Sequence, residues 1–154
     1  DDAPWLAELA HYEWVELALQ ISDDAPPRHD PAGDLLDGIP LPSPHAWALA
    51  YRWPVSRIGP DHRPTTPPAA PTLLLVRRDA DHTIRFAALS PLMYRLFELA
   101  GERRFTGRQL LQQLAGEAGV AADDDFMAQG AAMLARMLRE GSLLGTALPE
   151  GAHP

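Results

Sequence analysis

Proline clustering is the feature that most restricts how this chain can fold. Twelve of its 16 prolines lie between residues 26 and 71. Proline lacks a backbone N–H and disfavours the helical conformation of the residue before it, so this segment cannot form a long helix or a central strand. Because Trp, Leu and Ile are interspersed among the prolines, we expect ordered coil that wraps the domain rather than a free linker.

A helix is predicted before this segment, from Pro4 to about Ser22. Asp2 is its expected N-cap, and the acidic and proline residues at 23–27 end it. Its apolar residues occupy two sides at helical spacing, one with Trp5, Tyr12, Val15 and Leu19, the other with Leu6, Ala10, Trp14, Leu17 and Ile21. Such a helix either packs wholly within its own domain or lies between this domain and another domain or partner, and the pattern leaves both interpretations open.

Three strands and then three helices are predicted from residue 47 onward. A strand over Trp47–Trp53 ends at Pro54, and a hairpin joins 72–77 to 83–89. Helices are expected at 92–100, 106–117 and 124–139, begun by Ser90, Thr106 and Asp123–Asp125, with a short final strand over 142–146. This order predicts an α+β, winged-helix-like fold, in which a small antiparallel sheet of about three strands precedes three helices. The N-terminal helix and the proline-rich wrapping segment are additions to it.

Composition and charge exclude several classes of function. The 154-residue chain suits one domain (26–154), with 1–25 as a linker or interface helix. It has no cysteine, which leaves the redox compartment open because a cysteine-free domain is stable in either setting. No apolar run approaches the roughly 18–20 residues that span a bilayer, so by default we expect a cytoplasmic protein without membrane contact. Its net charge is −8, and residues 1–30 carry eight acidic residues against one arginine. Without a basic stripe, nucleic acid is a disfavoured partner.

A search for catalytic and metal-binding motifs finds none. The chain lacks a glycine-rich phosphate loop and a G-x-S-x-G nucleophile motif, and its six histidines never occur at i,i+2 or i,i+4. Glu13 and Glu16 lie one helical turn apart, but a surface or interface role explains them better than acid–base catalysis. Asp123–Asp125 fit the positive end of a helix. We therefore expect a non-enzymatic protein without cofactor or metal.

Seven segments, in this order, resemble one protein family. Together they span residues 4–146, and they are 4–14 (PWLAELAHYEW), 35–44 (LLDGIPLPSP), 51–55 (YRWPV), 73–78 (LLLVRR), 89–91 (LSP), 106–111 (TGRQLL) and 143–146 (LLGT). The chain is similar to the C-terminal domain of the HvfC proteins, which are related to the methanobactin accessory protein MbnC. Each segment is weak alone, and the seven in register are fairly specific.

The resemblance implies an accessory protein for a multinuclear iron enzyme that modifies cysteines of a ribosomally made precursor peptide, often in copper-linked pathways. In such systems the domain resembles a peptide-recognition winged helix, to whose sheet the precursor's leader adds a strand. Family members usually carry a further helical domain on the N-terminal side, and since no such domain precedes residue 1 here, we expect this sequence to be a fragment of a longer protein. The family has also been labelled DNA-binding, largely through that domain.

Strand addition to a sheet edge agrees with the physics of peptide recognition, since backbone pairing supplies affinity and alternate side chains supply specificity. The expected peptide site therefore combines a strand and a helix face: Thr83, Ile84, Arg85, Phe86, Ala87, Ala88, Phe126, Met127, Gly130 and Met133. Phe126, Gly130 and Met133 also fit a plain core role, and Arg85 fits either a leader carboxylate or solvent. Trp5, Tyr12 and Trp14 are the candidate partner interface.

The main alternative is a DNA-binding regulator. It would use helices 106–117 and 124–139, with Arg103, Arg104 and Arg108 at phosphates, and its binding would weaken steeply with salt. The acidic net charge and the three aspartates at the start of the last helix count against it. An enzyme of unknown type is a third possibility, disfavoured by the empty motif search.

Overall fold

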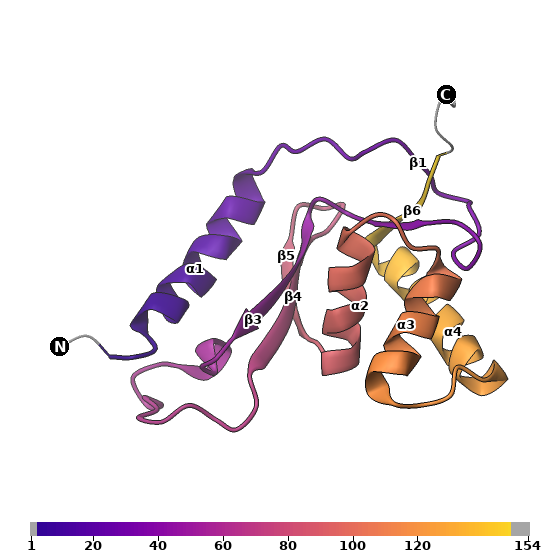
Figure 1. Cartoon of the computed structure of the whole chain (residues 1–154). Helices are drawn as coiled ribbons and strands as arrows, with labels where there is room; N and C mark the ends of the chain where they lie inside the picture. The colour runs from indigo at the N-terminus through magenta and orange to yellow at the C-terminus, as the bar shows by residue number, and fades with distance from the viewer. Residues whose placement is uncertain (1–2, 149–154) are drawn as a thin grey trace.

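The protein has an α+β fold with two small antiparallel sheets. In the computed structural model, residues 3–148 are described (Figure 1). The elements are α1 (Leu6–Ile21), β1 (His29–Asp30), β2 (Pro40–Pro42), β3 (Ala46–Tyr51), a 3₁₀ turn η1 (Val55–Arg57), β4 (Thr72–Arg78), β5 (Ile84–Ala88), α2 (Pro91–Gly101), α3 (Gly107–Ala118), α4 (Asp124–Glu140) and β6 (Leu143–Ala147). The predicted α+β class is confirmed, whereas the winged-helix likeness stays a prediction. The prediction had one sheet of about three strands, whereas residues 3–148 form two three-stranded sheets.

The larger sheet has the strand order β3-β4-β5 and is covered on both faces. Alternation along the strands sends Trp47, Leu49 and Val76 toward α1, where they pack with Val15 and Leu19. Ala46 and Leu75, on the opposite face, belong to the main core with the helices. Figure 1 shows α1 on one side of this sheet and α2, α3 and α4 on the other.

Helix α1 begins later than predicted. Its N-cap position is Trp5, which makes no capping side-chain bond, and the expected cap Asp2 lies outside the described residues. The buried face of the helix carries Val15 and Leu19. The Glu8 carboxylate accepts hydrogen bonds from the backbone N–H groups of Arg52 and Trp53, at 3.0 and 2.8 Å, and thereby anchors the helix near the end of β3.

The three later helices begin where their capping residues predicted. Ser90 accepts a bond from the Met93 N–H, and Thr106 forms a capping box with Gln109. Asp123 caps α4. Helices α3 and α4 end in left-handed glycines. The inward side chains of α2, α3 and α4 form the main core between the helices and the sheet. Its fully buried members include Leu96, Leu110, Leu111, Leu114, Leu134 and Met137.

The proline-rich segment contributes strands as well as coil. β1 and β2 pair with the two edges of β6, giving the second sheet in the order β1-β6-β2. The carbonyl oxygens of Gly38 and Leu36 accept from the free N–H groups of Gly107 and Arg108 at the start of α3, at 3.0 and 2.9 Å. The predicted strand over Trp47–Trp53 ends at Tyr51, two residues early.

Candidate functional site

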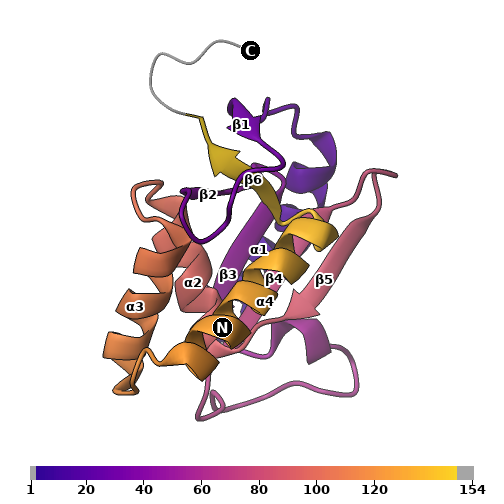
Figure 2. The same ribbon diagram turned by 90° about the vertical axis from the view of Figure 1, so that its right-hand side faces the viewer.

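β5 lies at the edge of the larger sheet. Among the strands of residues 3–148 it pairs with β4 only, and Figure 2 shows it at the outer margin of the sheet. The Leu89 N–H donates to the Leu73 oxygen and the Asp79 N–H to the Thr83 oxygen, each at 2.9 Å. In an antiparallel pair the hydrogen-bonded positions alternate, so odd-numbered residues of β5 bond to β4. The N–H and C=O groups of the even-numbered residues, 84, 86 and 88, therefore point to the free edge.

The side chains of β5 alternate as predicted. Ile84 and Phe86 are half-buried on the α1 face, where the Phe86 ring lies 5.1 Å from the Tyr12 ring between centroids. Arg85 and Ala87 are exposed on the opposite face. Thr83 belongs to the turn, and its N–H donates to the Asp81 carboxylate at 3.1 Å. The edge thus has one apolar side and one open side.

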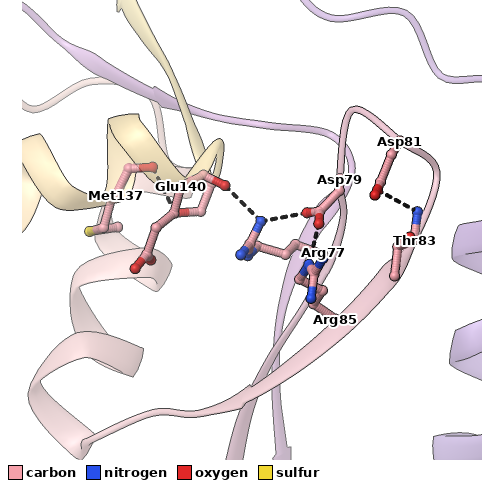
Figure 3. Close-up of polar contacts among 8 residues, drawn as sticks. Arg77, Asp79, Asp81, Thr83, Arg85, Met137 and Glu140 are labelled. Atoms are coloured by element: carbon pink, nitrogen blue, oxygen red, sulfur yellow. Dashed lines mark hydrogen bonds and ion pairs between the residues drawn. The ribbon is translucent and has the colours of Figure 1, made fainter.

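Arg85 already has an acidic partner within the chain. Its guanidinium is ion-paired with Asp79, which also accepts from Arg77 Nη1 at 2.7 Å (Figure 3). The hydrogen bond that Arg85 donates to the Asp79 carboxylate, together with that carboxylate's charge, raises the pKa of Arg85 above its ordinary value. Arg77 Nη1 donates further to the Glu140 carbonyl at 2.8 Å. A leader carboxylate would therefore have to compete with Asp79 for Arg85.

The predicted helix residues lie apart from the edge strand. Phe126, Gly130 and Met133 line a small apolar pocket of about 40 Å³ between α2, α3 and α4. A Cβ atom built on Gly130 would lie 2.4 Å from a Leu111 methyl, so glycine permits the close approach of α3 and α4. Met127 packs against the main core. The structure thus divides the predicted peptide site between the free edge of β5 and this pocket.

The three aromatic residues of the predicted partner interface do not share a surface. Trp5 and Tyr12 pack inward on the cluster formed by Tyr51, Trp53, Val55 and Leu74. Only Trp14 is exposed. Helix geometry alone placed these rings on two sides of the helix, but the sequence did not show which side the sheet covers.

Two residues that the sequence did not indicate as site residues, Arg77 and Arg78, lie at the hairpin end of β4. Arg78 Nη1 donates to the carbonyls of Leu19, Gln20 and Ser22, at 2.9, 3.2 and 2.7 Å, at the C-terminus of α1. Arg77 Nη1 likewise donates to the carbonyl of Glu140, the last residue of α4. Cations favour the negative end of a helix dipole, but nothing in the local sequence identifies the helix that an arginine in a strand will reach.

His11 and Tyr51, two polar groups near the sheet, are engaged in a structural contact. His11 Nδ1 lies 2.8 Å from the Tyr51 hydroxyl, whose pKa burial and the Glu8 charge raise to about 12. No group of three metal-ligating side chains occurs between residues 3 and 148, and no helix there is long and apolar enough to cross a membrane.

The arginines of the alternative DNA-binding hypothesis are largely paired with carboxylates. Arg104 forms an ion pair with Glu102 and lies over the Phe105 ring, and Arg108 contacts Asp37 at 3.2 Å. Arg103 occupies a left-handed backbone conformation after α2. Phosphate binding by Arg104 or Arg108 would have to displace their carboxylate partners.

Comparison with known proteins supplies the family. A family model described as the HvfC C-terminal domain matches residues 43–138. The chain belongs to this family. The matched part of the HvfC domain contains β3, β4, β5, α2, α3 and most of α4, and therefore both halves of the candidate site. No individually curated protein matches the chain.

Proposed function

We propose that this HvfC domain is a non-catalytic, peptide-binding accessory subunit that takes an extended precursor segment as an added strand at β5. The observation that carries the proposal is the free edge, at which the backbone groups of residues 84, 86 and 88 point away from β4. The resemblance to HvfC proteins supports a leader peptide as the ligand and a multinuclear iron enzyme that modifies cysteines, in a copper-linked pathway, as the partner.

The surroundings of the edge favour peptide capture over simple protection from water. Proteins commonly blunt an exposed edge with proline, with charged side chains, lysine above all, or with a covering segment. The sequence of β5, Ile-Arg-Phe-Ala-Ala, contains no proline or lysine, and the charge of its one arginine, Arg85, is paired with Asp79. An added strand would place alternate side chains beside Ile84 and Phe86 on the α1 face and beside Arg85 and Ala87 on the other. Backbone pairing would supply affinity, and these two sets of contacts would supply selectivity.

Proline substitution at two alanines tests the proposal. Ala88→Pro removes one outward N–H of β5 without removing a β4–β5 bond, and an edge strand tolerates proline there. Ala50→Pro is the matched control, because Ala50 is an exposed alanine on the opposite edge strand β3, and its N–H also points outward by register. The probe is a fluorescently labelled peptide from the N-terminal region of the precursor encoded beside this gene, with a scrambled control, followed by anisotropy.

We expect Ala88→Pro to weaken binding about tenfold or more, since an unpaired buried backbone group costs about 1–3 kcal/mol and 1.4 kcal/mol is tenfold. Ala50→Pro should leave the affinity within about twofold. An affinity of folded Ala88→Pro equal to that of the unsubstituted protein would refute binding at β5. An equal loss of affinity in both variants would also contradict the proposal, because the peptide would then not distinguish the two edges. Methylation of single peptide amides, one at a time, should weaken binding only at every second residue, because only alternate amides of an added strand face β5.

A further inference from the structure

The outer face of α1 is the largest gathering of exposed apolar side chains in the described chain. Within residues 3–148 five large apolar residues are exposed, and four of them lie on α1. Leu6, Trp14, Leu17 and Ile21 are 42, 57, 60 and 72% exposed. With the exposed Ala10 they define the outer stripe of α1, which runs the length of the helix, about 22 Å at 1.5 Å per residue.

The outer stripe cannot turn inward, because the opposite side of α1 is already fastened to the domain. Val15 and Leu19 are 1 and 0% exposed against the sheet. Glu8 binds the backbone after β3, and Arg78 binds the last carbonyls of the helix. A surface helix with one buried side normally carries polar residues on the other. The outer stripe therefore presents apolar area in a fixed orientation, as protein-binding surfaces do.

The charge beside the stripe restricts what can cover it. Helix α1 contains three glutamates and no arginine or lysine. The Glu8 carboxylate accepts hydrogen bonds from the backbone after β3. Glu13 and Glu16, in contrast, are exposed on one flank of the stripe and form no ion pair within residues 3–148. Asp23 and Asp24 extend the negative charge beyond the C-terminus of the helix. This flank would repel nucleic acid and anionic lipid.

A second copy of the chain also fits the outer stripe poorly. A two-fold dimer uses the same patch on both subunits. Pairing α1 with α1 along the stripe would therefore bring the Glu13 and Glu16 flank of one copy beside the same acidic helix of the other. Neither copy has an arginine or lysine on α1 with which to compensate.

The spacing of the stripe fits one helix of a partner. Residues 6, 10, 14, 17 and 21 are separated by four, four, three and four positions, which is the spacing of a seam between two packed helices. We propose that the outer stripe of α1 packs against an amphipathic helix of a partner protein, whose apolar seam is flanked by arginine or lysine residues that face Glu13 and Glu16. This surface is independent of the β5 edge, since it lies on the face of α1 turned away from the sheet.

Two designed helical peptides provide the probe. They share leucines at seam positions and differ only in the flanking residues, which are arginine in one and glutamate in the other. The chain has no cysteine, so Ala7→Cys on the rim of the stripe can carry a single environment-sensitive fluorophore. Ala132→Cys, at an exposed alanine of α4, is the control position. We expect a saturable signal with the arginine peptide at position 7 and none at position 132.

Substitutions then separate the apolar and the charged contributions. Trp14→Ala should weaken binding of the arginine peptide about tenfold or more, because a central aromatic residue dominates such interfaces. The double variant Glu13→Gln, Glu16→Gln should weaken it several-fold and remove most of its salt dependence. Val120→Ala, which shortens the remaining exposed apolar residue far from α1, should change nothing.

Three results would overturn the proposal. The first is equal binding of the two peptides, which would show that charge has no part. The second is no saturable binding of the arginine peptide to a folded chain. The third is self-association in sedimentation that Trp14→Ala abolishes, which would make a second copy the occupant.

Discussion

Replacement of Arg78 by methionine should detach the C-terminal end of α1 from the sheet. The guanidinium donates to three carbonyls at the end of α1, and its Nη2 lies 3.0 Å from His45 Nε2. A hydrogen bond from a charged group contributes about 1.5–3 kcal/mol, and a cation at a helix C-terminus about 0.3–1 kcal/mol. Methionine keeps most of the apolar stem. We therefore expect a loss of about 2–4 kcal/mol in the free energy of unfolding.

Urea unfolding followed by circular dichroism measures this loss. With a slope of about 1–3 kcal/mol/M, the midpoint should fall by on the order of 1–2 M. Arg136→Met is the control, because its i,i+4 ion pair with Glu140 is exposed and such pairs contribute about 0.3–0.5 kcal/mol. Amide exchange should rise most in the last turn of α1. A midpoint for Arg78→Met equal to that of the control, with α1 amides unchanged, would refute the capping role.

Three further outcomes follow from single sites. Gly107→Ala should cost at least about 2 kcal/mol of stability, because its Cβ would lie 1.8 Å from the Leu35 carbonyl oxygen, whereas Gly101→Ala, with open space, should be neutral in the same urea assay. The pKa of Tyr51 is raised to about 12, so the folded state prefers the neutral phenol. Stability should therefore fall between pH 10 and 12, and thermal melts should show a smaller fall in Tyr51→Phe. Hydrogen bonds from Arg95 of α2 lower the pKa of Glu117 to about 2. Glu117→Gln should therefore destabilise the protein at pH 7, and the difference in stability between the variant and the unsubstituted protein should vanish as the pH falls from about 4.5 to 2.

Local sequence signals predicted the helices and the larger sheet well. Ser90, Thr106 and Asp123 cap helices at the residues expected, because capping depends on contacts within three residues. The hairpin 72–89 was also predicted, since its turn and its alternation are local. β1 and β2 were not, because two- and three-residue strands have no periodicity and form only by pairing with β6, more than 100 residues along the chain.

The candidate site was predicted in part for the same reason. Alternation separated Ile84 and Phe86 from Arg85, but only the pairing with β4 shows that β5 is an edge and which of its amides point outward. Helical spacing grouped Phe126, Gly130 and Met133 on one face. It did not show that α2 and α3, rather than β5, lie against that face. Spacing defines a face, and only the tertiary fold defines its neighbour.

Arg77 and Arg78 show how the sheet holds helices on both of its faces. Neighbouring residues of a strand point to opposite faces, so one arginine reaches the end of α4 and the next reaches the end of α1. Both bonds lie at the hairpin end of β4, beside the turn that leads into β5. The helices on the two faces are thereby fixed relative to the edge strand. A peptide added at β5 would meet a preformed surface on each side, which lowers the ordering cost of binding to that of the peptide itself.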